Sequence, residues 1–99
     1  MDYMFSGFKG TELDLSNFVT PILDRTSYMF LSCTNLMRLD IRNMDFTSVG
    51  ISTAMFGQNA NTYVPADCLI IVKDDTAKEW VLAKRSDFTN VKTVAELGV

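Results

Sequence analysis

The chain has 99 residues, of which 47% are hydrophobic and 21% charged, and its formal net charge is −3. This size and composition predict one globular domain with a thin core and exclude a disordered or collagen-like chain. The weak negative charge also argues against nucleic acid as a partner, because phosphate backbones are bound through clustered Lys and Arg.

Two sequence landmarks recur every 25 or 26 residues. Tyr3-Met4-Phe5 returns as Tyr28-Met29-Phe30 and again as Ala54-Met55-Phe56. Leu13-Asp14-Leu15 returns in step with them as Leu39-Asp40-Ile41. One apolar-x-apolar strand in each unit, at a period within the range of roughly 20–29 residues, is typical of the leucine-rich-repeat class.

Each repeat is expected to contribute one short parallel strand, near residues 12–16 and 38–42. Alternate side chains of a strand face opposite sides, so the Leu and Ile residues of the landmark point inward. The Met-Phe pairs of the three repeats would fill the opposite wall of the core: Met4, Phe5, Met29, Phe30, Met55 and Phe56.

The charged residues between these apolar positions are the candidate binding site. The outward side chains are Glu12, Asp14, Arg38, Asp40 and Arg42. They form either a recognition surface or a solvated face in which Asp14 makes a cross-strand pair with Arg42 or Asp40.

The repeat rhythm ends after Thr62, and residues 64–99 are expected to close the structure. The β-branched run at residues 68–73 predicts a buried strand, the last in the stack. Thr76 and Glu79 have capping-box spacing, which predicts a helix over residues 76–86 with an apolar stripe led by Trp80. Asp74-Asp75 are expected to be helix caps and solvated charge rather than a cation site. Residues 87–99 fit either a strand or a helix.

Together these elements predict a single α/β domain. Residues 1–63 form the coils of a leucine-rich-repeat-like right-handed solenoid with short parallel strands. Residues 64–99 add the last strand and a C-terminal capping helix.

The repeats resemble those of the BspA-type leucine-rich-repeat family, on residues 4–18 and 27–41. The first unit departs from that pattern, because Phe8-Lys9-Gly10-Thr11 is one residue short and lacks the cysteine that Cys33 supplies in the second unit. The resemblance implies a non-catalytic binding or adhesion module, the C-terminal part of a bacterial surface protein or a phage tail or receptor-binding protein. Its partner would be a cell-surface protein or glycan. The alternative is a structural capping or assembly domain of a larger exported or virion protein.

The N-terminus, by contrast, shows no cap. Met1-Asp2-Tyr3-Met4 enters in the middle of a repeat and carries no signal peptide, so any export signal would lie outside this chain. An open first coil would expose a strand edge and apolar side chains. We therefore expect a preceding domain of a longer parent chain to cover it, or a second copy of this chain, with closed symmetry.

No residue pattern for catalysis, metal or cofactor binding is present. The chain has no histidine, which excludes Ser-His-Asp and Cys-His arrangements and leaves few zinc ligands. Cys33 and Cys68 are expected to be buried apolar side chains. No P-loop, dinucleotide fingerprint or calcium loop occurs, and no apolar run approaches the length of a transmembrane helix.

Overall fold

Four short strands form one parallel sheet in which their spatial order follows their order in the chain. They are β1 (Glu12–Asp14), β2 (Arg38–Asp40), β3 (Leu69–Val72) and β4 (Val91–Thr93). The structure is a computed structural model and describes residues 3–17, 25–44, 46, 49–59 and 61–98. The prediction of parallel strands stacked in chain order is confirmed, with bounds shorter than expected.

The strand register explains why the sheet forms. Leu13, Leu39, Ile70 and Val91 lie opposite one another across all four strands, so each repeat places an apolar side chain against its counterpart. Leu39 and Ile70, from the two central strands, are fully buried. A short strand cannot bury a core alone, and lateral pairing satisfies its backbone as well.

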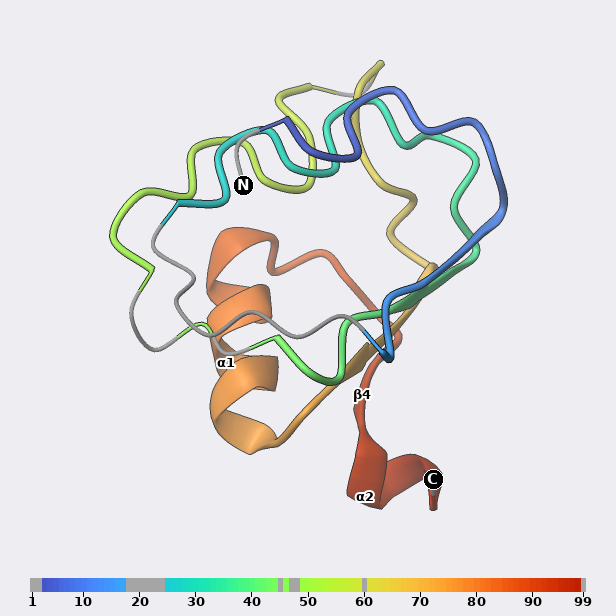
Figure 1. The fold of residues 1–99 in the computed structure, drawn as a ribbon, viewed down its shortest axis with the longest axis vertical. Helices are drawn as coiled ribbons and strands as arrows, with labels where there is room; N and C mark the ends of the chain where they lie inside the picture. The colour runs from blue at the N-terminus through green and yellow to red at the C-terminus, as the bar shows by residue number, and fades with distance from the viewer. Residues whose placement is uncertain (1–2, 18–24, 45, 47–48, 60, 99) are drawn as a thin grey trace.

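Three turn segments, residues 3–7, 26–32 and 51–57, make up the wall opposite the sheet (Figure 1). Phe5, Phe30 and Phe56 stack with ring centroids 5.8 Å apart at each step. Met29 and Met55 are buried beside them, as predicted. The prediction for Met4 is wrong, because its side chain is 51% exposed at the outer edge of the first turn segment.

Helix α1 (Asp75–Lys84) begins where Asp74 accepts a hydrogen bond from the backbone N–H of Ala77. Asp74 is therefore the N-cap, and the prediction that Thr76 caps the helix is wrong. The buried residues of the helix are Ala77 and Val81, while Trp80 is only partly buried. The apolar stripe exists, but Val81 rather than Trp80 is its most buried member.

The end of the chain differs most from expectation. The prediction that residues 68–73 form the last strand is wrong: α1 leads to β4, which pairs with β3 in parallel. The short helix α2 (Val94–Leu97) follows directly, with Thr93 and Glu96 forming a capping box. Residues 87–99 thus contain both a strand and a helix. Each is too short for a periodic pattern to reveal it in the sequence. No helix in the described part of the chain could cross a membrane.

Candidate functional site

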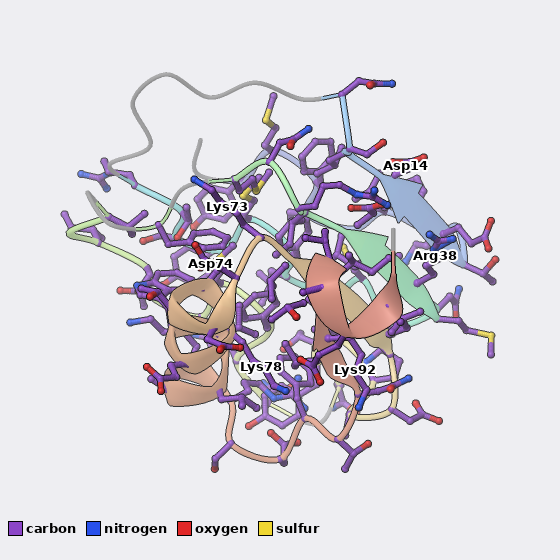
Figure 2. All side chains as sticks on the ribbon, turned by 90° about the horizontal axis from the view of Figure 1, so that it is seen from below. Asp14, Arg38, Lys73, Asp74, Lys78 and Lys92 are labelled. Carbon is purple, nitrogen blue, oxygen red and sulfur yellow. The ribbon has the colours of Figure 1, made fainter. Side chains whose placement is uncertain are left out.

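The outward side of the sheet carries two rows of side chains set by the strand register. Glu12, Arg38 and Leu69 lie opposite one another, and so do Asp14, Asp40, Ile71 and Lys92. We call the residues of these rows and Arg42 the charged face. Figure 2 shows Asp14 and Arg38 beside the first two strands, and Lys92 further along the same side. The structure therefore brings together the five residues predicted from the sequence and adds Lys92.

The prediction that Asp40 is exposed is wrong, because its side chain is only 2% accessible. Arg42 folds over it: Nε donates to the two carboxylate oxygens at 3.0 and 3.1 Å, and Nη2 lies 2.6 Å from Oδ2. Arg38 Nη2 lies 4.0 Å from the same oxygen. Residues two apart in a strand share a face, so both guanidinium groups can reach the carboxylate between them. Asp40 thus holds Arg42 in place by direct hydrogen bonds, lies within ion-pair distance of Arg38, and is itself too buried to contact a partner.

Asp14 has the same local geometry in the first repeat. Its carboxylate accepts the backbone N–H of Ser16 at 2.9 Å, as Asp40 accepts that of Arg42 at 3.2 Å. The hydrogen bonds from Ser16 hold the pKa of Asp14 below its usual range, and Arg38 and Arg42 lower it further. Asp14 is thus a solvent-exposed carboxylate that stays ionised, and Arg42 acts on it through space while pairing directly with Asp40.

The groups left accessible on this face are both acidic and basic. Glu12 and Asp14 are exposed, the side chain of Arg38 is 45% accessible and that of Arg42 26%. Such a set can make charge-assisted hydrogen bonds to a polar or ionic partner.

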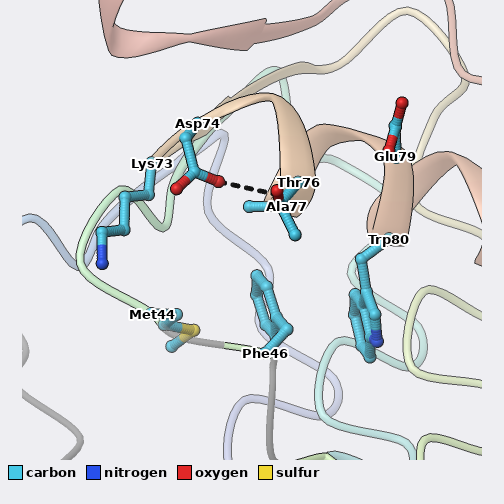
Figure 3. A pocket seen from close by; sticks show the side chains of 8 residues that line it. All are labelled: Met44, Phe46, Lys73, Asp74, Thr76, Ala77, Glu79 and Trp80. Carbon is cyan, nitrogen blue, oxygen red and sulfur yellow. Dashed lines mark hydrogen bonds between the residues drawn. The ribbon is translucent and has the colours of Figure 1, made fainter.

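A second candidate site, a cavity of about 440 Å³, lies beside the first turn of α1. Phe46 and Trp80 stack in it with ring centroids 4.3 Å apart and an interplanar angle of 5°. Figure 3 shows Met44 and Phe46 on its floor and Lys73 and Asp74 at its rim. Sequence patterns missed this cavity because residues from the second repeat and from α1 form it only in three dimensions.

The two cysteines are buried, as predicted, and they are free thiols. Cys33 Sγ donates a hydrogen bond to the carbonyl of Phe5 at 3.1 Å, and burial raises its pKa. Burial raises the pKa of Cys68 to about 12. Neither thiol is therefore activated as a nucleophile. Among the described residues, no three His, Cys, Asp or Glu side chains gather closely enough to hold a metal ion.

Compared with protein-family models, with curated proteins and with solved structures, the chain gives no match. The geometry of the charged face is therefore the observation from which a function can be inferred.

Proposed function

We propose that this chain is a leucine-rich-repeat-like right-handed solenoid that acts as a non-catalytic binding module through the charged face of its sheet. The near-regular spacing of the repeats, with equivalent methionines at positions 4, 29 and 55, supports the solenoid. So do the in-register apolar rows, in which Leu13 of the first repeat lies opposite Leu39 of the second. The α1–β4–α2 segment would close its C-terminal end.

The observation that carries the proposal is the hydrogen-bonded pair of Asp40 and Arg42, which lies next to the solvent-accessible side chain of Arg38. The buried carboxylate of Asp40 keeps the guanidinium group of Arg42 in a defined position before a partner arrives and attracts that of Arg38 from 4.0 Å. Preorganised side chains lose less conformational entropy on binding than free ones. Strand pairing also fixes the spacing of Glu12 and Asp14 relative to Arg38 at about 5 Å per strand.

The partner that fits this face is a polar cell-surface protein or glycan bearing both hydrogen-bond donors and acceptors. The repeat pattern favours an extracellular role, as the C-terminal part of a bacterial surface protein or of a phage tail or receptor-binding protein. A structural role in a larger exported or virion protein is the second candidate. The exposed Tyr3 and Met4 side chains favour it, because they suit contact with further protein.

Charge reversal on the face tests the binding role. Labelled protein is titrated onto intact Gram-positive cells and onto arrays of neutral and acidic glycans. The Arg38→Glu variant should bind at least tenfold more weakly than the unaltered chain. Lys84→Glu, an exposed position on α1, is the matched control and should bind unchanged.

Two results would contradict the binding role. One is binding that Arg38→Glu and Lys84→Glu weaken equally, since the charged face would then not be the contact surface. The other is the absence of binding to cells and to every glycan tested, which would favour the structural role.

A further inference from the structure

Tyr3 and Tyr28, at equivalent positions of the first two repeats, stack their rings. The ring centroids lie 4.8 Å apart and the interplanar angle is 14°. Tyr3 donates its backbone N–H to the carbonyl of Ser27, the residue before Tyr28. Both tyrosines adopt a left-handed φ, 60° for Tyr3 and 58° for Tyr28. The same backbone conformation and the lateral pairing of the turn segments therefore align one ring with the other.

Ala54 takes the next position in this row but carries no ring. Its φ of 49° is again left-handed, and the carbonyl of Thr53 before it accepts the N–H of Tyr28 at 2.8 Å. The backbone thus places Ala54 beside Tyr28 as it places Tyr28 beside Tyr3. Tyr28 is still partly accessible, and within the described part of the chain its ring contacts no ring but that of Tyr3. Among these residues, one face of the Tyr28 ring has no aromatic neighbour.

A polar groove of about 480 Å³ opens beside the small side chain of Ala54. Residues 50–57 form one side of it, and the other side consists of the end of α1 and the residue after it, Ala83, Lys84 and Arg85. Ser52 and Thr53 bring hydroxyl groups to the groove, and exposed Lys84 brings an ammonium group. The space that a third ring would occupy is therefore bordered by hydrogen-bonding side chains.

We propose that this groove binds a pyranose ring, which stacks over Ala54 on the uncovered face of Tyr28. A sugar ring has a flat face of C–H bonds, and the negative face of an aromatic ring attracts their partial positive charge. Its hydroxyl groups need hydrogen-bond partners, which Ser52, Thr53 and Lys84 can supply. An aromatic ligand fits less well, because it would cover these polar groups without giving them partners.

The pyranose site is separate from the charged face, because the turn segments form the wall opposite the sheet (Figure 1). It acts through stacking on a ring and hydrogen bonds to hydroxyl groups, whereas the charged face acts through Arg38 and its acidic neighbours. The inference therefore goes beyond the proposed function and does not depend on it, and a variant of either surface should leave the other intact.

Two variants remove the pyranose site in different ways. Ala54→Tyr places a third ring in the row and fills the space, at a φ that Tyr3 and Tyr28 already adopt. Tyr28→Leu removes the stacking face and keeps an apolar side chain. The matched controls are Ala54→Ser, which stays small, and Tyr3→Leu, which leaves the uncovered face of Tyr28 in place. Arg38→Glu tests independence from the charged face. Circular dichroism confirms that each variant is folded.

The whole chain, labelled with ¹⁵N, is titrated with methyl β-glucopyranoside, with methyl β-galactopyranoside and with p-cresol, the side-chain analogue of tyrosine. At least one pyranoside should shift the amide signals of Thr53, Ala54 and Lys84 to saturation. Ala54→Tyr and Tyr28→Leu should each weaken this binding about tenfold or more, because each removes the stacking contact. Ala54→Ser, Tyr3→Leu and Arg38→Glu should change it by less than about twofold.

The melting temperature gives a second readout that needs no ligand. Ala54→Tyr should melt about 2–8 °C higher than Ala54→Leu, because only the tyrosine ring continues the stack. A lower value for Ala54→Tyr would show that the row does not extend to Ala54 and would overturn the proposal.

Three binding results would also overturn it. One is the absence of a saturable shift with either pyranoside. Another is a response to p-cresol alone, which would assign the groove to aromatic ligands. The third is pyranoside binding that Ala54→Tyr leaves unchanged or that Arg38→Glu weakens equally, because the sugar would then lie elsewhere.

Discussion

Arg85 Nη1 donates a hydrogen bond to the backbone carbonyl of Val64 at 2.7 Å and so ties the end of α1 to the segment that follows the third repeat. The same nitrogen donates to the carbonyl of Phe56 at 3.2 Å. The carboxylate of Asp87 also accepts a hydrogen bond from the guanidinium group, with Arg85 Nη2 at 2.5 Å from Oδ2. Arg85 Cζ also lies over the rings of Tyr63 and Phe88, at 4.1 and 4.4 Å from their centroids. A buried cation thus joins the repeats to the C-terminal segment.

Arg85→Ala should destabilise the fold by about 2–4 kcal/mol, because it leaves the carbonyl of Val64 without a donor and removes one of the two donors to the carbonyl of Phe56. Urea unfolding followed by circular dichroism measures the change. Lys84→Ala, at the neighbouring exposed position, is the control and should cost less than about 1 kcal/mol. A loss for Arg85→Ala equal to that of the control would mean that the guanidinium contributes nothing to stability.

Stability should fall in acid partly through Asp87. The hydrogen bonds from Arg85 lower the pKa of Asp87 below its ordinary value of 3.8. A carboxyl whose folded pKa is lowered contributes its full stabilisation above the unfolded pKa and loses it as the pH falls through the folded pKa. In thermal unfolding, the contribution of Asp87 to the melting temperature should therefore be full and constant above about pH 5 and should be lost as the pH falls below about 4.

The Asp87→Asn variant isolates this contribution. It should be less stable than the unaltered chain at pH 7, and the difference between the two should shrink as the pH falls below about 4. Asp75→Asn, at an exposed carboxyl outside this cluster, is the comparison. A difference that stays constant down to pH 2 would show that the Arg85–Asp87 pair does not depend on the charge of Asp87.

Ser32→Gly should stabilise the protein by about 0.5–1 kcal/mol, because Ser32 adopts a left-handed φ of 64° that favours glycine. Gly7 holds the corresponding place in the first repeat, with φ of 77°. The opposite substitution is Gly57→Ala. Its Cβ would lie 2.5 Å from the Cα of Tyr63, at φ of 118°, so it should be strongly destabilising. Equal stabilities for the two variants in chemical denaturation would contradict this account of the turns.

Both thiols should resist alkylation in the folded protein. Cys33 and Cys68 are fully buried, and their raised pKa values leave almost no thiolate at pH 8. Mass spectrometry after brief iodoacetamide treatment should find neither modified in the native protein and both modified in denaturant. Rapid modification of either thiol under native conditions would show that the core opens locally.

Trp80→Ala should destabilise the fold by about 2–3 kcal/mol, less than for a fully buried tryptophan, because one ring face packs on Phe46 while the residue stays partly accessible. Trp80→Phe should recover most of the loss, since it keeps an aromatic ring on Phe46. The measurement is the midpoint of urea unfolding. If Trp80→Phe were as unstable as Trp80→Ala, the stack with Phe46 would not be the stabilising contact.

The sequence by itself determined the repeat and the order of the strands. Leu13 and Leu39 could be assigned to neighbouring parallel strands because the repeat period and the alternation of side chains along a strand are local properties, readable without knowing what packs on them. The burial of the two cysteines and the acidic start of α1 could also be predicted, from residue type and from local capping preferences.

Tertiary structure alone decided the burial of Asp40, the position of β4 and the buried place of Arg85. Asp40 is an outward residue by alternation, yet Arg42 covers it, and the pattern holds no information about which cation folds over which carboxylate. Arg85 has the appearance of a solvated helix-end charge in the sequence. It is buried because carbonyls of Phe56 and Val64, distant from it in the chain, converge on it after the chain has folded.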